Sequence, residues 1–383
     1  MARRPRLGEV TEELLSPDEV RSALRAYFAD GLDEARSLRD DTSAPGFDRG
    51  RWKSLAGEVG LVAMAAPETA GGLGLGLAHL TSALEEAGAR LYPGPACASV
   101  LTAWVLNRQG TDLPDGTEDL LDGSAIIGVP QAFAARRPRA ALSDGRVSGL
   151  VPAVTHGMSA GLLLTMADSP QGTLPVLVRL DGDGVAHRPV RAADLTARPA
   201  DLDLTAAPAT VLAAPADELR QVARLLLAAE QVGGAQGCLD QMTGYAKIRT
   251  QFGQVIGGYQ AIQHRCARVA IAIAAARALV LAAAKAIDSA GTDADRDAAH
   301  QSVLLAKAEA SDAFTDAADA LVQVHGGIGF TWEHDAHLYF RRARATAAMD
   351  GRPSRLRDDA VTAGCLSLLT RVPAGRPDAP SRP

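Results

Sequence analysis

A carboxylate near the C-terminal end of the sequence is the first candidate for catalysis. Asp350 lies in the stretch AMDGRPS at 348–354, on a glycine turn that follows a helix-rich segment. A carboxylate enclosed by apolar groups has its pKa raised toward neutrality and can remove a proton from a weak carbon acid. Asp350 is therefore a candidate general base, and the alternative is an ordinary turn aspartate.

Two further stretches carry residues that could hold a ligand. RTQFG at 249–253 offers the guanidinium of Arg249, which can pair bidentately with a pyrophosphate, and the neutral amide of Gln251. QVHGG at 323–327 places the amide of Gln323 ahead of Gly326 and Gly327, where backbone could approach a ligand closely. The alternative for the glycine pair is an ordinary C-terminal cap of the preceding helix.

The other reactive side chains predict no metal site. The four cysteines are far apart and have neither CxxC nor His-paired spacing, which favours small core residues in a reducing cytoplasm: Cys97, Cys238, Cys266 and Cys365. The histidines around the glycine pair lack the spacing of a metal triad, which favours structural or surface roles: His325, His334 and His337.

Charge and hydropathy exclude some partners. The net charge is -6, and the 39 basic and 45 acidic residues are spread along the chain without a basic stripe, so nucleic acid is not an expected partner. The N-terminal arginines are not followed by an apolar signal segment, and we find no run of about 18 apolar residues. We therefore predict a cytoplasmic protein without a membrane span.

The first two parts of the chain differ in the spacing of their apolar residues. Residues 1–122 have helical spacing of apolar positions, with helices expected over 17–38, 48–59 and 77–89. Residues 123–214 hold short apolar runs separated by Gly, Pro, Asp and Ser, which predict a small antiparallel sheet or barrel. The segment LDGDGV at 180–185 is typical of a hairpin turn.

Long helices return after Pro215. Segments of about 30 residues at 217–249, 260–290 and 293–323 predict a helical bundle over 215–371, and the Pro-rich residues 372–383 predict a disordered tail. The segment 260–290 is apolar nearly all round, so we expect it at the centre of the bundle, and its charged residues argue against a membrane span. The predicted fold class is α+β, with domains at 1–122, 123–214 and 215–371.

The order of these blocks resembles the acyl-CoA dehydrogenases. The stretches RTQFGQVIGGYQAIQH at 249–264 and QVHGGIGFTWEHDAHLYFRRAR at 323–344 are similar to that family's R-x-Q-F-G and Q-x-x-G-G-x-G-(F/Y) signatures. In the first block, LAGEVGLVAMAAPETAGGLGLG and EEAGARLYPGP also look like the family's N-terminal domain. The resemblance covers nearly the whole chain and is weakest in its middle block.

This resemblance implies an FAD site shared between the subunits of a dimer or of a dimer of dimers. One subunit would contribute the RTQFG stretch, with Arg249, Gln251 and Phe252, and its neighbour the glycine turn, with Gln323, Gly326 and Gly327. From the residue type alone, Phe252 is equally a core aromatic.

The resemblance also implies a place for the base. In the family, a Glu in a turn resembling E-G-T follows the second glycine of the pair by 23 residues, and the same count from Gly327 reaches Asp350. Asp is one methylene shorter, and Arg352 stands in place of the Thr, so backbone or substrate must shift to restore reach. Some members carry the base on the helix before R-x-Q-F-G, but the matching position here is Ala223. Glu230 is a nearby carboxylate whose alternative is a locally paired or capping helix residue.

The middle block departs from the family pattern. The family's T-E-P-x-x-G-S-D stretch is absent, and the corresponding region reads VPQAFAARRPRAALSDG at 129–145. Shortened sequences of this kind resemble actinobacterial members, including subunits of heteromeric enzymes that act on steroid side chains.

Three functions follow as hypotheses. The first is an FAD-dependent acyl-CoA dehydrogenase, alone or as one subunit, in which Asp350 removes the α proton of an acyl-CoA thioester while the β hydride leaves for flavin, with an electron-transfer flavoprotein or a similar acceptor downstream. The second is a non-catalytic partner subunit of a heteromeric acyl-CoA dehydrogenase. The third is a flavin monooxygenase or a tailoring enzyme of secondary metabolism on the same fold.

Overall fold

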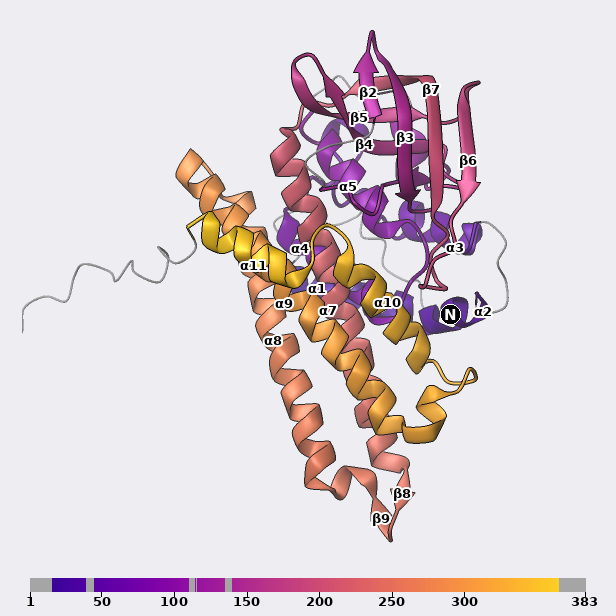
Figure 1. The fold of residues 1–383 in the computed structure, drawn as a ribbon, viewed down its shortest axis with the longest axis vertical. Coiled ribbons are helices and arrows are strands. Elements are labelled where there is room, and N and C mark those ends of the chain that lie inside the picture. Colours follow the sequence, from indigo (N-terminus) through magenta and orange to yellow (C-terminus); the bar gives the residue numbers. More distant parts are fainter. Residues whose placement is uncertain (1–15, 39–44, 110–113, 115, 135–139, 365–383) are drawn as a thin grey trace, which may run out of the picture.

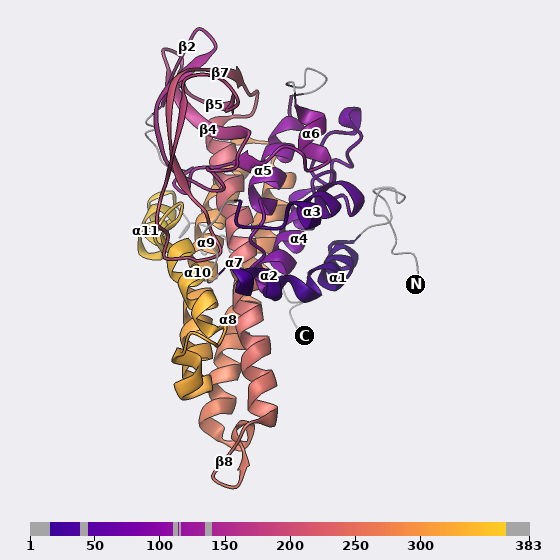
Figure 2. The ribbon, with the colours of Figure 1, turned by 90° about the vertical axis from the view of Figure 1, so that its right-hand side faces the viewer.

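A small β region lies at one end of the molecule, and long helices extend from it to the other end (Figure 1). The computed structural model describes residues 16–38, 45–109, 114, 116–134 and 140–364. The predicted tail at 372–383 and Cys365 lie outside these residues. In the view of Figure 2, the N-terminal helices cover one side of the long-helix bundle.

The N-terminal region is helical, as its periodicity predicts. Its elements are α1 (Pro17–Tyr27), a 3-10 turn (Phe28–Asp30), α2 (Gly31–Ser37), α3 (Arg49–Lys53), a π-helical turn (Ser54–Glu58), a 3-10 turn (Glu68–Ala70), α4 (Leu77–Ala89), α5 (Ala96–Leu106) and α6 (Thr117–Leu121). The helix expected over 77–89 is confirmed at both ends. The helix expected over 17–38 is broken ahead of Gly31, a residue type that weakens helices by about 1 kcal/mol. The sequence does not predict α5, because this helix is buried nearly all round and has little apolar periodicity.

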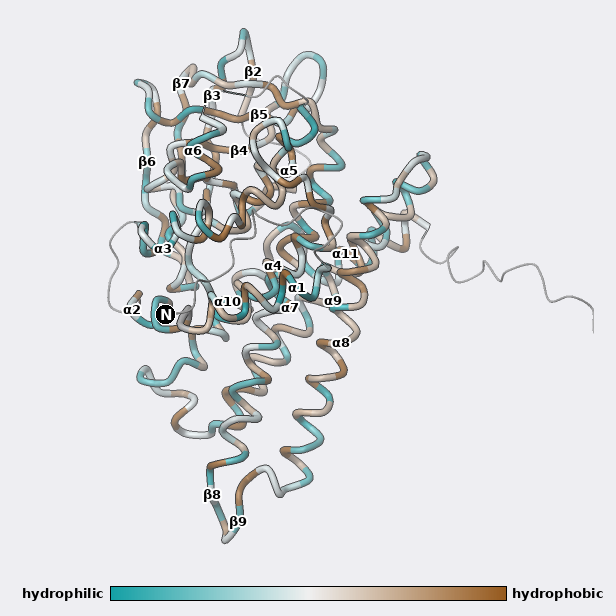
Figure 3. The backbone as a smooth tube through the Cα atoms, turned by 180° about the vertical axis from the view of Figure 1, so that it is seen from behind, coloured by the Kyte–Doolittle hydropathy of each residue, from teal (hydrophilic) through white to brown (hydrophobic). Residues whose placement is uncertain are grey.

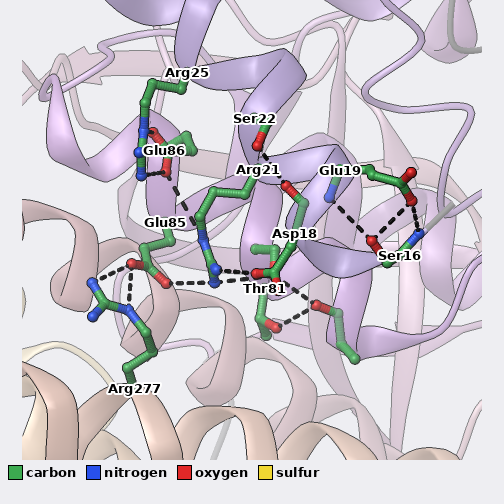
Figure 4. A network of polar contacts seen from close by, with 12 residues as sticks. Ser16, Asp18, Glu19, Arg21, Ser22, Arg25, Thr81, Glu85, Glu86 and Arg277 are labelled. Carbon is green, nitrogen blue, oxygen red and sulfur yellow. Dashed lines mark hydrogen bonds and ion pairs between the residues drawn. The ribbon is translucent and has the colours of Figure 1, made fainter.

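Buried ion pairs connect α1 to α4 (Figure 4). Glu85 and Glu86 of α4 are almost completely buried. Arg25 Nη2 donates to Glu86 Oε1 over 2.8 Å, and Arg21 Nη2 donates to Glu85 Oε2 over 3.3 Å. Arg277, from the long-helix bundle, approaches Glu85 Oε1 from the other side at 2.6 Å. Each buried carboxylate therefore has a cation, which offsets the cost of removing it from water.

The middle region is a closed barrel. Its strands are β1 (Ile127–Gly128), β2 (Ala140–Ser143), β3 (Arg146–Val154), β4 (Leu162–Ser169), β5 (Gly172–Arg179), β6 (Val185–Pro189) and β7 (Ala200–Val211). Five of them close a circuit in which neighbours are hydrogen-bonded in the order β4, β2, β3, β7, β5 and back to β4. Apolar side chains such as Val147, Leu163, Val176 and Leu202 fill its interior.

Two expected details of the β region are wrong. The β1–β4 and β2–β4 pairings are parallel, because the chain crosses between these strands instead of turning straight back. The segment 180–185 joins β5 to β6, but the two strands it connects do not form a hairpin. The long strand β7 pairs with β6 through residues 200–204 and with β5 through residues 209–211. Both strands are therefore hydrogen-bonded to β7 and not to each other.

The C-terminal region is the predicted bundle of long helices. Its elements are α7 (Ala216–Ile248), β8 (Thr250–Gln251), β9 (Gln254–Val255), a 3-10 turn (Ile256–Gly258), α8 (Gln260–Asp288), α9 (Asp293–His325), a 3-10 turn (Gly326–Phe330), α10 (Ala336–Ala348) and α11 (Pro353–Thr362). Glycines let α7 cross α4 backbone to backbone. A Cβ on Gly233 would lie 1.9 Å from the carbonyl oxygen of Glu85, and one on Gly88 would lie 2.0 Å from that of Glu230.

The expected central place of the helix at 260–290 is wrong. Figures 1 and 3 place α8 at the edge of the bundle, while α7 and α9 carry the longer runs of buried residues. Only 33% of the most apolar window of α8 is buried, although the length and composition of α8 alone would let it cross a membrane. One such helix is weak evidence for a membrane span. Within one chain, α8 instead presents an apolar face that nothing in the described part of the chain covers.

Candidate active site

Asp350 occupies a strained turn between α10 and α11. Its backbone is left-handed, with φ of 55°, and Gly351 follows with φ of 123°. The Ala134 N–H, from the loop after β1, donates to Asp350 Oδ1 over 2.7 Å. Arg224 Nε of α7 donates to the backbone carbonyl of Asp350 over 2.9 Å. The carboxylate is therefore held in one place by a β-region loop, and its turn is held by the bundle.

The surroundings of Asp350 raise the pKa of its carboxyl group toward neutral pH. Burial raises the pKa of the Asp350 carboxyl to about 6, although the Ala134 N–H and the positive charges of Arg224 and Lys307 act in the opposite direction. A carboxyl with this pKa is mostly ionised at pH 7 and is still basic enough to accept a proton. This matches the requirement for a general base.

Asp350 lies on the wall of a partly open cavity of about 140 Å³. The cavity is bounded by α4, α5, α7, α10 and the loop after β1, so it lies between all three regions of the fold. Ala223 also lines it, which shows that the second location considered for a base faces the same space without a carboxylate. Cys97 packs against the hydrophobic core, as expected, and also lines the cavity; burial raises the pKa of its thiol.

A buried ion cluster forms another part of the cavity wall. Arg342 of α10 makes short ion pairs with Glu230 of α7 and with Asp194 of the segment between β6 and β7. Arg342 Nε also donates to Thr196 Oγ1 over 3.1 Å. Glu230 is thus paired, although with another helix and not with a residue of its own helix. Because its charge is already matched by a guanidinium, Glu230 is a weaker candidate base than Asp350.

A lysine lies behind Asp350 in the bundle core. Lys307 of α9 is fully buried, and its Nζ donates to Ser311 Oγ over 2.8 Å and to the Thr346 carbonyl over 3.3 Å. Ser311 Oγ donates in turn to Gln231 Oε1 over 3.1 Å, and Gln231 Nε2 donates to Thr346 Oγ1 over 3.1 Å. Burial lowers the pKa of Lys307 to about 8, while the charge of Asp350 acts in the opposite direction. The ammonium is therefore fixed in position and still largely charged at pH 7.

This arrangement predicts an effect of Lys307 on the pH dependence of activity. In the Lys307→Met variant, a cation that lowers the pKa of Asp350 is absent, so the acid limb of the kcat/KM profile should move to higher pH. The profile is measured between pH 5 and 9 on protein that has passed a thermal-unfolding check. Lys285→Met on the exposed side of α8 is the control and should leave the limb in place. An unchanged limb in Lys307→Met would show that this cation does not act on the base.

The residues expected to hold the cofactor lie at the far end of the bundle, away from Asp350. Arg249 is the C-terminal cap residue of α7, and Gln251 lies directly after it in β8, in the short β8–β9 ribbon at that end of the bundle (Figure 1). The guanidinium of Arg249 has no ion-pair partner in the described part of the chain. Phe252 is 93% exposed, with a left-handed φ of 52°, so it is not the core aromatic that the sequence left open.

The glycine turn lies at the same end of the bundle. The rings of Tyr245, near the end of α7, and His325, at the end of α9, stack at 4.2 Å. Gly326 caps α9 with φ of 62°, which favours glycine, so the capping interpretation accounts for this residue. A Cβ on Gly327 would meet nothing within 4 Å, so no close contact within the described residues accounts for the second glycine. Gln323 is exposed and lines a groove along α8. Both expected cofactor-binding groups therefore sit together on one chain, open to a ligand or a partner.

The histidines beside this turn have structural contacts. His325 is buried and its Nδ1 is 2.9 Å from the carbonyl of Leu321, and its ring lies 4.3 Å from that of His334. His337 stacks on Trp332 at 4.7 Å. Among the residues that the structure describes, no group of three or more His, Cys, Asp or Glu side chains could hold a metal ion.

Two family models match the sequence over most of its helical regions. The acyl-CoA dehydrogenase N-terminal domain matches residues 16–113, and the acyl-CoA dehydrogenase C-terminal domain matches residues 216–361. The acyl-CoA dehydrogenase IpdE2 of Mycolicibacterium smegmatis is 32% identical over 350 residues, which cover 91% of this chain and 94% of that protein. The chain belongs to the acyl-CoA dehydrogenase family. The resemblance seen in the sequence and the predicted α+β fold are thereby confirmed.

Solved acyl-CoA dehydrogenases share the fold along nearly the whole chain. A variant of the Tcur3481–Tcur3483 steroid ACAD has a TM-score of 0.82 and 30% identity, covering 91% of this chain and 98% of its own. The ChsE4–ChsE5 complex from Mycobacterium tuberculosis has a TM-score of 0.80 and 25% identity, covering 95% of this chain and 99% of its own. The second of these structures is a complex of two differently named chains.

Several residues around the Asp350 cavity do not follow from the sequence. Arg342, Asp194 and Lys307 belong to segments whose contact depends on the packing of three regions. The sequence could have singled out Lys307, because it is one of only four lysines and lies within an otherwise apolar stretch, LLAKA. No comparable feature of the sequence points to Asp194.

Proposed function

We propose that this chain is the base-bearing subunit of an FAD-dependent acyl-CoA dehydrogenase, with Asp350 as the base. The observation that supports this most is the Asp350 carboxylate itself, which is held on the wall of a cavity and has a pKa raised by burial to about 6. In this reaction the α proton of an acyl thioester moves to a base, and hydride leaves the β carbon. When bound, FAD supplies the acceptor for that hydride.

The chain's own residues account for the proton step. The Asp350 carboxylate takes the α proton through the oxygen that the Ala134 N–H does not occupy, since Ala134 engages Oδ1. Burial of the Asp350 side chain raises its pKa, which keeps the carboxylate basic. The left-handed turn at 350–351 changes the direction in which the carboxylate leaves the backbone, so we propose that this turn compensates for the shorter side chain of Asp relative to Glu.

The exposed end of the bundle fits a dinucleotide cofactor shared with another chain. Arg249, which has no ion pair among the described residues, offers a cation for a pyrophosphate. Gln251 and Gln323 offer amides, and Gly327 leaves its Cβ direction open. An acyl-CoA dehydrogenase of this fold from Bacillus anthracis was solved with FAD. Because these residues lie far along the bundle from Asp350, we propose that the complete site needs the bundle end of one chain and the cavity of another.

The edge helix α8 is the surface that we propose for this assembly. Many residues of its exposed face are alanines, which are small enough for another helix to approach closely. Ile271 lies on the same face and is 69% exposed. The ChsE4–ChsE5 relative is a complex of two differently named chains, and we propose a homologous or identical chain as the partner here. An electron-transfer flavoprotein is the proposed electron acceptor, since a subunit of the caffeyl-CoA reductase–Etf complex of Acetobacterium woodii is 35% identical over 130 residues.

We expect Ile271→Glu to weaken this assembly. A carboxylate placed in an apolar contact must lose its hydration, so the association constant should fall by at least about tenfold. Analytical ultracentrifugation over a range of concentrations measures the change. Val361→Glu is the matched control, because Val361 is also a half-exposed apolar residue, on α11. Equal association by both variants and the unchanged chain would remove α8 as the interface.

The absorption spectrum of the purified protein tests the proposed function most directly. About one flavin per Asp350-bearing site, bleached when an acyl-CoA is added without oxygen, is the expected result. Flavin bleaching that needs a second homologue but not Asp350 would favour the non-catalytic partner subunit. Oxygen consumption with an external flavin reductase, and no acyl-CoA oxidation, would favour the monooxygenase hypothesis.

A further inference from the structure

A buried glutamine joins three helices of the bundle close to the proposed base. Gln231 of α7 is 2% exposed. Its side chain donates to Thr346 Oγ1 of α10 over 3.1 Å and accepts from Ser311 Oγ of α9 over 3.1 Å. Each end of the amide is therefore bound to a different neighbouring helix. Thr346 belongs to the last turn of α10, four residues before Asp350.

Two consecutive residues of α7 hold α10 at two points. Glu230 forms an ion pair with Arg342, and Gln231 binds Thr346, which lies four residues after Arg342. Residues four apart in a helix lie one above the other on the same face. One contact would leave α10 free to rotate or slide against α7, whereas two contacts on successive turns fix both its rotation and its height. The contact of Gln231 is the one nearer to Asp350.

The surroundings of Gln231 indicate that this contact does more than add stability. On its own helix, Gln231 lies among buried apolar residues, including Leu227, Ala228 and Val232. A satisfied buried polar group is on average no more stabilising than an apolar side chain that fills the same space. A hydrogen bond is directional, however, so it fixes the relative position of two helices more closely than apolar contacts do. Gln231 is thus placed to fix the end of α10.

We infer that Gln231 is a positioning residue for the base. It fixes the last turn of α10 through Thr346, and this turn brings Asp350 to the place where the Ala134 N–H and Arg224 Nε bind it. Asp has a shorter reach than Glu, and a displacement of about 1 Å costs on the order of a hundredfold in rate. The inference rests on the proposed function for the proton step, and it goes beyond it by naming the residue that sets the position of the base.

The Gln231→Leu variant tests the inference and leaves both partners of Gln231 with another hydrogen bond. Ser311 Oγ also donates to the carbonyl of Lys307 over 2.8 Å, and Thr346 Oγ1 also donates to the carbonyl of Arg342 over 2.8 Å. The ammonium of Lys307 keeps its own contacts with Ser311 and Thr346. Because Leu is close to Gln in size and no polar group loses its last partner, we expect this variant to fold.

We expect kcat for acyl-CoA oxidation to fall by roughly 10- to 100-fold in Gln231→Leu, with KM changed by less than about twofold. A displaced base slows the chemical step, whereas the groups that bind the substrate are untouched. The acid limb of the kcat/KM profile should stay in place, which distinguishes this variant from Lys307→Met. The assays use the protein as purified, with its cofactor and any partner chain retained. Gln236→Leu is the matched control, because Gln236 also lies on α7 but binds Asp240 and Arg277 instead of α10.

Hydrogen exchange at Ala134 provides a measurement that needs no turnover. The Ala134 N–H is bound to Asp350 Oδ1, so its exchange rate reports whether the carboxylate is in place. Mass spectrometry of a peptide over 129–134 follows this amide, and Asp350→Ala gives the rate without the carboxylate. In Gln231→Leu the amide should exchange at least about tenfold faster than in the unchanged protein, while exchange along α9 stays the same. Gln236→Leu should change neither rate.

Three results would overturn the inference. They are an unchanged kcat with unchanged exchange at Ala134, faster exchange along the whole bundle, which would make Gln231 a purely structural residue, and an acid limb shifted as in Lys307→Met, which would assign the effect to charge. The proposed function can fail separately. If the unchanged protein does not oxidise acyl-CoA but Gln231→Leu alone accelerates exchange at Ala134, the dehydrogenase function is removed and the positioning of Asp350 by Gln231 stands.

Discussion

We expect the Asp350→Asn variant to lose acyl-CoA oxidation by roughly 10²- to 10⁴-fold, the range that a general base contributes. Asn has nearly the same shape as Asp and can still accept the Ala134 N–H bond, but it cannot take the α proton. Flavin content per chain should stay unchanged, because the proposed cofactor contacts lie at the other end of the bundle. Rapid-reaction flavin reduction measures the chemical step. The control is Asp358→Asn, an exposed aspartate on α11.

The same substitution should stabilise the fold at neutral pH. Burial raises the folded-state pKa of Asp350 to about 6, above its ordinary value of 3.8, so the folded state holds this proton more tightly than the unfolded chain does. The stability that Asp350 contributes is therefore full below pH 4 and is lost as pH rises through 6. Asn has no charge to bury, so its Tm relative to the unchanged protein should be higher at pH 7.5 than at pH 4. Normal turnover by this variant, or a pH-independent Tm difference, would contradict the assignment of Asp350.

We expect Arg249→Ala to lose flavin without losing its fold. Arg249 has no intrachain ion pair in the part of the chain described, so its removal leaves no buried carboxylate without a partner. The loss of a bidentate contact to a pyrophosphate should lower flavin affinity by roughly 10- to 100-fold. Flavin per chain after dialysis and the far-UV circular dichroism spectrum measure the two effects. The control is Arg355→Ala, an exposed arginine paired within α11. Retention of flavin in Arg249→Ala would place the cofactor elsewhere.

Mixing the two variants shows whether identical chains share a site. If Asp350 comes from one chain and Arg249 from an identical neighbour, a hybrid dimer of the two variants has one intact site. Random assembly should then restore about a quarter of the unchanged activity, since half of the dimers are hybrids. No restoration, together with flavin that binds only in the presence of an unlike homologue, would show that the neighbour is a different chain.

Local patterns account for much of the fold. The helices over 77–89, 216–248 and 293–325 follow from apolar spacing that can be counted along the chain, and the closed barrel agrees with its short apolar runs. The predictions fail where burial is uniform or pairing is non-local. Examples are α5, which has little periodicity, and the segment 180–185, whose strands both pair with β7.

The sequence by itself determined the family, through two spaced motifs, and the place of one carboxylate, through its count from Gly327. Only the tertiary structure decided what surrounds that carboxylate. Ala134, Lys307 and Arg224 approach Asp350 from positions 216, 43 and 126 residues away in the chain, and no local pattern records such contacts. The same holds for α8, whose composition predicts burial while its position at the edge of the bundle leaves one face open. Composition indicates how much apolar surface a segment could bury. Which neighbouring segment covers that surface depends on contacts that form only when distant segments pack together.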